Sequence, residues 1–421
     1  MKKSFIESKN GSKIFSWTIF LLPALALDFS FGVGLIEVVM LLGTLLCIPR
    51  LFTEVQHLSV GARLLVAVFF ANLLIAGLTI SWRGNEFNFL DNPARQFLVL
   101  SAIVLIPLAR PTPRYLWSGL IVGCLAAFGM AVYQYGVLHI GRAFGAHQSI
   151  LFGDIAMAMG VMSLASIPLF IQSRYKWLAI LPYLAFAGGV VASALSGTRG
   201  GWAAILLALL PLSMVGTKKH FRLLIFAVVT GLFAIFFSVA SLHGGVETRS
   251  REAYSDIQKF QQGDINTSVG LRFEMWGAAA KLFLDNPWTG VGRANFRQGL
   301  NSLADQHRAD QGVRIFPHAH NEILNELATA GLAGGIILLL QYLAPLLFFI
   351  RAKRDEAQRP YAVAGILLVL SYFIFGLTEV LFSQHLGAVF YAAFVAVLAG
   401  LCIAEERRSI ELAAPLSGGS R

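Results

Sequence analysis

The chain has 421 residues, of which 56% are hydrophobic and 13% charged, and its formal net charge is +10. Soluble domains carry about 25% charged residues, and their apolar positions recur at helix or strand spacing. Here apolar residues form unbroken runs long enough to cross a bilayer, which excludes an ordinary soluble domain. The three cysteines all lie inside such runs, away from any spacing typical of a metal or redox site.

The apolar runs predict about twelve transmembrane helices, because about 20 apolar residues are needed to span the hydrocarbon core as a helix. The fold class expected is therefore an all-α integral membrane protein. The predicted spans are Ile14–Leu27, Gly32–Ile48, Ala62–Ile80, Gln96–Leu108, Tyr115–Leu138, Ile150–Ile171, Trp177–Leu195, Gly201–Val215, Leu223–Leu242, Ile323–Ile350, Tyr361–Leu381 and Leu386–Ile403.

Lysine and arginine gather in alternate loops, twenty on one side of the predicted bilayer and four in the short loops opposite. Cytoplasmic loops carry the excess of basic residues, so both termini are predicted to be cytoplasmic. The net positive charge is therefore explained by membrane topology, and no nucleic-acid partner is expected. The first span is expected to be retained, although Ala24–Ala26 resembles a signal-peptide cleavage site.

The predicted spans divide the chain into four parts. Residues 1–242 hold helices 1 to 9, residues 243–321 form one long outer loop, residues 322–404 hold helices 10 to 12, and residues 405–421 form a cytoplasmic tail. Within the outer loop, Glu247–Gln262 and Leu271–Leu284 read as short amphipathic helices. The apolar face of the second helix is expected to lie on the bilayer surface, and the loop to cap the outer mouth of the bundle.

Two arginines on the outer side are candidates for binding an anion. Arg199 lies between glycines at the end of a span, and Arg272 begins the second loop helix. The alternatives are a snorkelling side chain for Arg199 and a weak surface salt bridge for Arg272. A fixed guanidinium suits bidentate binding of phosphate. Farther along, a glycine-rich turn with Arg293 could form an anion-binding nest.

Two histidines, His318 and His320, stand immediately before the tenth span, and Asn321 follows them. Three interpretations compete. The pair fills a helix junction that Asn321 caps; or, with His307 as a third ligand, it binds zinc; or one histidine acts as a general base. Neutral imidazole has a pKa near 6.5, so it can accept a proton from a sugar hydroxyl at ambient pH.

Other polar residues gather at the outer ends of spans. Either of two groups could orient a substrate, although polar residues are common at membrane interfaces. The first comprises Tyr133, Gln134, His139, Arg142, His147 and Gln148, and the second Glu379, Gln384 and His385.

Three motifs resemble the O-antigen ligase family, which shares a superfamily with O-antigen polymerases and protein O-oligosaccharyltransferases. The first is His320-Asn321, nine residues, then Gly331-Leu-Ala-Gly334. The second is Ser196-Gly-Thr-Arg199-Gly-Gly, although Ala203 stands where some ligases have leucine. The third is Arg272-Phe-Glu-Met-Trp276 with Pro287-Trp-Thr-Gly-Val-Gly292.

The resemblance implies a GT-C-like glycosyltransferase of the bacterial inner membrane with a periplasmic active site. Its donor would be a glycan on undecaprenyl pyrophosphate, its acceptor a sugar hydroxyl of lipid A-core, and its pathway lipopolysaccharide biosynthesis. The residues and the resemblance together predict an inverting reaction with no cofactor and no metal.

The roles expected from the residues and the resemblance together are assigned as follows. His320 is the base, Arg199 and Arg272 bind the pyrophosphate, and the further substrate-binding candidates are His318, Asn321, Arg293 and Gln148. The alternatives are an O-antigen polymerase, a protein O-oligosaccharyltransferase or, from a different class, a secondary transporter. Transporters usually have related halves and polar sites at the midplane, whereas the polar candidates here gather at one face.

Overall fold

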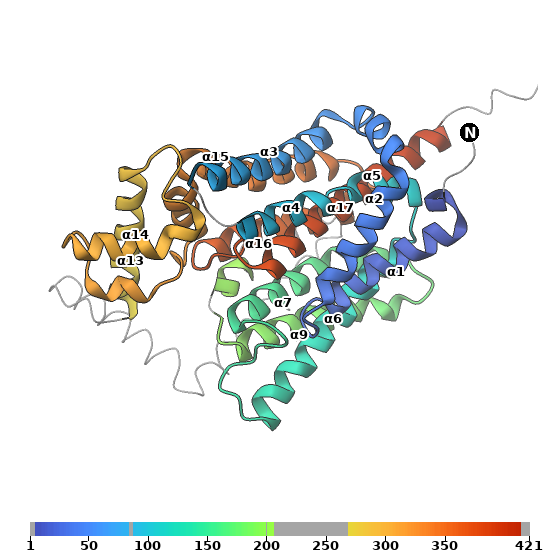
Figure 1. Cartoon of the computed structure of the whole chain (residues 1–421). Coiled ribbons are helices and arrows are strands. Elements are labelled where there is room, and N and C mark those ends of the chain that lie inside the picture. The colour runs from blue at the N-terminus through green and yellow to red at the C-terminus, as the bar shows by residue number, and fades with distance from the viewer. Residues whose placement is uncertain (1–4, 84–86, 199, 206–267, 414–421) are drawn as a thin grey trace, which may run out of the picture.

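The computed structural model describes residues 5–83, 87–198, 200–205 and 268–413, and the regular structure in this part of the chain is helical (Figure 1). The helices of the first half are α1 (Lys9–Leu25), α2 (Gly32–Gln56), α3 (Val60–Arg83), α4 (Asp91–Val99), α5 (Ala102–Ala109), α6 (Arg114–Val132), α7 (Ser149–Ser163), α8 (Ile167–Ile171) and α9 (Leu181–Leu195). Those of the second half are α13 (Ser268–Asp285), α14 (Phe296–Asp305), α15 (Glu322–Ala352), α16 (Arg359–Gly376) and α17 (His385–Ala413).

Nine helical segments in the described residues are long and apolar enough to cross a membrane. Each coincides with a predicted span, and α1, at 17 residues, coincides with the first. The spans predicted at 201–215 and 223–242 lie, except for residues 201–205, outside the described residues. The prediction of an all-α, multi-pass membrane protein is confirmed.

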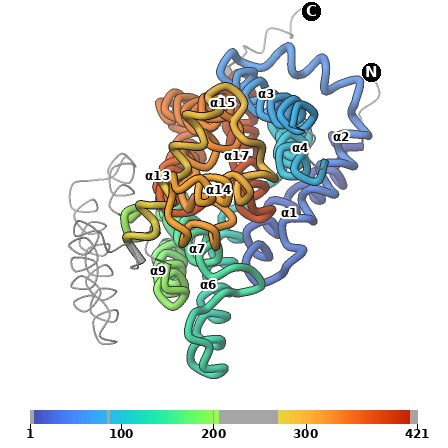
Figure 2. Tube along the Cα trace, turned by 60° about the vertical axis from the view of Figure 1, so that its left-hand side comes forward, coloured from blue at the N-terminus to red at the C-terminus, as the bar shows by residue number. Residues whose placement is uncertain are grey.

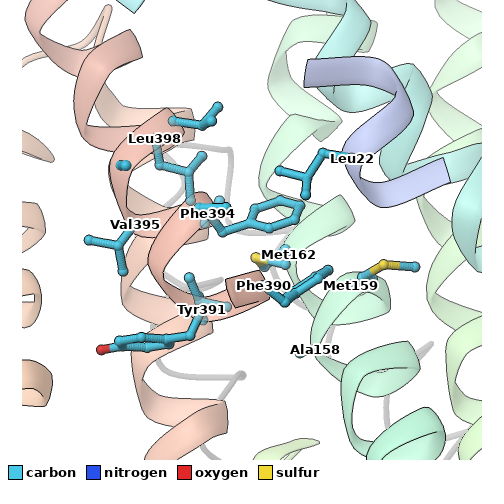
Figure 3. Close-up of a cluster of buried hydrophobic side chains, with 14 of the residues drawn as sticks. Leu22, Ala158, Met159, Met162, Phe390, Tyr391, Phe394, Val395 and Leu398 are labelled. Carbon is cyan, nitrogen blue, oxygen red and sulfur yellow. The ribbon is translucent and has the colours of Figure 1, made fainter. Parts of the chain in front are cut away.

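Helix α17, whose apolar segment is fully buried in protein, occupies the centre of the bundle. Figure 3 shows Phe390 and Phe394 of α17 beside Leu22 of α1 and Met159 and Met162 of α7, and all five side chains are buried. A helix that is hydrophobic on every side is stable where other helices surround it. The hydropathy of this segment therefore reflects burial in protein rather than contact with lipid.

Polar contacts gather at the two ends of the bundle. At one end Arg407 pairs with Glu54 at 2.7 Å, and Arg110 pairs with Glu411. The charge pattern assigns the helix ends that carry these residues to the same side of the bilayer. The described helices therefore have the orientations that the alternation of basic loops predicts. Which end faces the cytoplasm stays a prediction.

The described part of the outer loop folds onto the first half of α15 (Figure 2). It consists of α13, α14, and the 3-10 turns Arg293–Asn295 and Gln311–Ile315, which share a small apolar core with α15. Met275 and Ala279 on the apolar face of α13 are fully buried in protein. The helix is present as predicted, but its apolar face does not lie on the bilayer surface, because α14 and α15 cover it. The other predicted loop helix, Glu247–Gln262, lies outside the described residues.

Helix α15 is broken at Gly331, whose φ of +66° is a left-handed conformation that glycine adopts without strain. The loop before α14 docks at this break, where Leu332 N–H donates to Pro287 O at 2.7 Å and Gly292 N–H donates to Thr329 O at 2.9 Å. A Cβ atom at Gly331 would come within 2.4 Å of the backbone of Trp288. Gly331 is therefore the hinge at which the loop docks on α15.

Candidate functional site

The His-Ala-His segment is fixed by contacts on both sides. Trp276 of α13 donates its ring N–H to Ala319 O at 2.9 Å, and Asn325 accepts a hydrogen bond from Ala319 N at 3.3 Å. Asn321 caps α15 by accepting from Leu324 N at 3.0 Å, and its amide donates to Leu377 O at 3.1 Å. The asparagine cap proposed from the sequence is thus present, and it also ties the start of α15 to the end of α16.

His320 faces a carboxylate that is 59 residues away in the chain. Its Nδ1 lies 3.2 Å from Glu379 Oε2, and His318 Nε2 lies 3.6 Å from Glu379 Oε1. Each imidazole is 20% exposed, whereas Glu379 is fully buried. Because an ionised carboxylate only accepts hydrogen bonds, Nδ1 of His320 donates to it, which leaves Nε2 with a free lone pair. A backbone φ of +45° at His320 is unusual for a residue other than glycine, and the contacts around it hold the conformation.

Glu379 is held by the turn that joins α16 to α17. Its Oε1 accepts from the N–H of Val380 at 3.0 Å. Glu322, the first residue of α15, accepts from the N–H groups of Leu381 and Phe382 at 2.6 and 3.1 Å. The start of α15 therefore fixes both the histidine and the turn that carries its carboxylate partner.

The charges at this site are set by burial and by the mutual contacts. Burial acts to raise the pKa of Glu379, but the hydrogen bonds from His320 and Val380 outweigh it and hold this pKa below its ordinary value. Burial lowers the pKa of His318, although Glu379 opposes this effect. At neutral pH the site therefore combines an ionised carboxylate with a neutral His318.

The predicted anion-binding arginines are placed only in part. Arg272 is exposed on α13, four residues before Trp276. Residues four apart lie on the same face of a helix, so Arg272 shares a face with Trp276, which contacts the His-Ala-His segment. Arg199 lies outside the described residues. Arg293 pairs with Glu326 at 2.9 Å.

Two further predictions concern the neighbourhood of the histidines. Gln148 accepts from the Gln384 amide at 2.6 Å, next to the turn that carries Glu379. The predicted anion-binding nest is wrong, because the N–H groups of Val291 and Gly292 donate to α15 carbonyls instead.

Two acidic residues at this end of the bundle were not predicted as site residues. Glu379 belonged to a group that could orient a substrate but was not assigned a role with the histidines, and its pairing with His320 depends on how α15 packs against α16. Asp154 of α7 is fully buried, and neither carboxylate oxygen has a hydrogen-bond partner among the described residues. A Cβ atom at Gly200, the residue after Arg199, would lie 3.5 Å from Asp154 Oδ1.

The same cluster is where the described residues could hold a metal ion. His318, His320 and Glu379 each offer one ligand atom, and these atoms lie within 4.8 Å of one another. The third ligand considered from the sequence, His307, instead lines a different shallow pocket with Glu274 and Asp310. A buried carboxylate replaces it because the turn between α16 and α17 folds back onto the histidines.

Fold and site together define a helical membrane protein that carries, among the described residues, a histidine–carboxylate pair at one end of the bundle. Residues 184–339 match the family model described as O-antigen ligase. This segment includes Arg199, Arg272 and both histidines of the site but ends before Glu379. The resemblance predicted from the motifs is confirmed, and it favours a ligase of the glycosyltransferase type.

Two relatives are similar to this chain, and the second of them is named an O-antigen ligase. An uncharacterized protein of Haemophilus influenzae is 28% identical over 315 residues, which are 72% of this chain and 77% of that protein. The O-antigen ligase of Escherichia coli is 25% identical over 171 residues, which are 40% of this chain and 39% of that protein. The match to the second therefore spans well under half of its length.

Proposed function

We propose that the protein is an O-antigen ligase of the bacterial inner membrane. It transfers a glycan from undecaprenyl pyrophosphate to a sugar hydroxyl of lipid A-core on the periplasmic face, without a metal and with inversion at the anomeric carbon. The observation that carries the proposal is the 3.2 Å contact between His320 Nδ1 and Glu379, which leaves Nε2 of His320 as the acceptor of a proton.

In this mechanism Nε2 of His320 removes the proton of the acceptor hydroxyl. The hydroxyl oxygen then forms a bond to the anomeric carbon of the donor, and the bond from that carbon to the pyrophosphate oxygen breaks with its electron pair. Attack opposite the leaving group inverts the configuration. Glu379 keeps the tautomer of His320 and stabilises the imidazolium as it forms, as carboxylates paired with catalytic histidines do.

Arg272 and Arg199 bind the pyrophosphate and stabilise the charge that develops on it, an electrostatic role that often supplies the largest catalytic term. For Arg272 the support is its exposed position on α13, one turn from Trp276. For Arg199 the support is its sequence motif. His318, Asn321, Arg293 and Gln148 are proposed to line the path of the substrates around this centre.

The proposal is tested with the purified full-length chain, an undecaprenyl-pyrophosphate glycan and lipid A-core in the presence of a chelator. Wild-type protein should form the conjugate, and His320→Ala should lose activity by roughly 10³-fold, within the range for loss of a general base. The matched control is His307→Ala, because His307 is also a histidine in the left-handed region, with φ of +56°, but lies outside the cluster.

Normal conjugate from folded His320→Ala protein contradicts the assigned base. Longer lipid-linked chains without conjugate would identify a polymerase instead, and transfer to protein would identify an oligosaccharyltransferase. Unchanged donor binding by an Arg199→Ala, Arg272→Ala double variant refutes the role of the arginines.

A further inference from the structure

The spacing of His318, His320 and Glu379 suits a metal ion that the proposed reaction does not use. Ligand atoms that surround a tetrahedral zinc ion at 2.0 to 2.2 Å lie about 3.4 Å from one another. Here the histidine nitrogens lie 3.2 and 3.6 Å from the oxygens of Glu379. Each distance is to a different oxygen of the carboxylate, and the three candidate ligand atoms lie within 4.8 Å of one another, so small side-chain movements bring them to one ion.

The kinds of ligand and their surroundings also suit such an ion. Two imidazoles and one carboxylate are the protein ligands of several zinc sites that leave a fourth position open. Both imidazoles are 20% exposed, so an ion can enter from water, while the buried carboxylate supplies the negative charge. The backbone between the two histidines is fixed, since Trp276 and Asn325 both form hydrogen bonds with Ala319. The ligands are thus largely in place before an ion arrives.

We propose that this cluster binds a divalent transition-metal cation such as Zn²⁺ and that the bound ion reversibly blocks glycan transfer. The ion takes the lone pairs of His320 Nδ1, His318 Nε2 and one oxygen of Glu379, with water in the fourth position. On His320 the proton moves from Nδ1 to Nε2. On His318 it moves from Nε2 to Nδ1, which breaks only the long 3.3 Å contact with the His320 N–H.

The block follows from the tautomer of His320 and rests on the proposed function. With the ion on Nδ1 and the proton on Nε2, the ring has no lone pair left to accept the acceptor's proton. The positive charge of the ion also cancels the charge by which Glu379 would stabilise an imidazolium. Binding of the ion itself does not depend on the reaction that the protein catalyses.

Binding is measured without reference to activity. Chelator-treated full-length protein, purified in detergent through a tag without histidine, is titrated with Co²⁺ and followed by the visible absorption of four-coordinate Co²⁺. One equivalent should bind and be displaced by Zn²⁺. His318→Gln and Glu379→Gln should each weaken binding by at least roughly tenfold. His307→Gln should bind as wild type, although its pocket also contains the carboxylates Glu274 and Asp310.

Inhibition is measured in the conjugation assay, where Zn²⁺ should abolish transfer and excess chelator should restore it. Absence of one-equivalent binding, or equal binding by folded His318→Gln protein, refutes the metal site. Binding with undiminished transfer refutes the block but leaves the site. Transfer that requires Zn²⁺ refutes both the block and the metal-independent reaction. Failure of the metal-free protein to form any conjugate counts against the proposed function alone, because the Co²⁺ titration still reports on the site.

Discussion

The contact between Glu379 and His320 makes a quantitative prediction about Glu379→Gln. In the reaction the imidazole gains a positive charge 3.2 Å from the carboxylate. At an effective dielectric constant of about 20, two unit charges at that separation attract by about 5 kcal/mol. A glutamine keeps the shape and a dipole, and the imidazole is 20% exposed, so about 3 kcal/mol of this should be lost. That corresponds to a rate decrease of about 100-fold.

The assay is the rate of conjugate formation at saturating donor and acceptor, with KM measured for each. The loss should fall on kcat, because in the proposed mechanism the carboxylate stabilises the positive charge that the imidazole gains during proton transfer. Glu379→Asp should recover part of the rate, since it restores the charge at a longer distance. Asp285→Asn is the matched control: this acid pairs with Arg308 at 2.7 Å on the surface, where such pairs contribute little.

A purely structural role for Glu379 would give a different pattern. If Glu379 only held the turn, by accepting a hydrogen bond from its N–H, then Glu379→Gln would lower the thermal stability. The kcat of the folded fraction would not change. A Glu379→Gln protein that unfolds at the wild-type temperature and retains more than about a tenth of the wild-type kcat would refute the reasoning, because its charge would then contribute less than about 1.4 kcal/mol.

Three other substitutions are tested by thermal unfolding in detergent: two lie in the framework around the site, and the third is at the partly buried Asp28. Asn321→Ala should cost about 1 kcal/mol of stability through the lost cap and should also lower kcat, because the tie to Leu377 that positions the histidines is broken. Gly331→Ala should destabilise the protein by about 2 kcal/mol or more, since the added Cβ would meet the Trp288 backbone. The control is Gly129→Ala, which should be neutral or slightly stabilising because no atom lies within 4 Å of the added Cβ. Equal effects of the two substitutions would refute the role of Gly331 as a hinge. Burial raises the pKa of Asp28 from 3.8 to about 6, so the folded state binds the proton more tightly, and the stability this gives below pH 3.8 is lost as the pH rises through 6. Asp28→Asn should therefore stabilise the protein at pH 7.5, by about 1 kcal/mol after allowance for partial exposure, and less toward pH 5; a gain independent of pH would contradict this cause.

The fold was predictable to the extent that membrane helices are governed by local sequence. Apolar length located every described span, because a helix in lipid satisfies its own backbone and needs no partner to be recognised. The docking of the outer loop was not predictable in this way. The apolar face of α13 has the same pattern whether a membrane or α15 covers it, and only the packed structure distinguishes the two.

The site residues, too, were predictable only where the signal is local in the sequence. His318, His320 and Asn321 were found because they lie close together in the sequence, immediately before a helix. A helix cap and a general base can both produce this local pattern. Glu379 carried no such signal, because its role arises from a contact across 59 residues. The break at Gly331 was likewise not predictable, since a glycine that supplies a left-handed hinge and one that permits close packing look alike in a sequence.

The way the site is assembled has a consequence for its mechanism. His320 and Glu379 lie at the same end of the α15–α16 hairpin, and Glu322 and Asn321 tie the start of α15 to the turn after α16. The distance between base and carboxylate is therefore fixed by the packing of two membrane helices rather than by a loop of its own. Substitutions that tilt α16 against α15 should alter catalysis even far from the histidines.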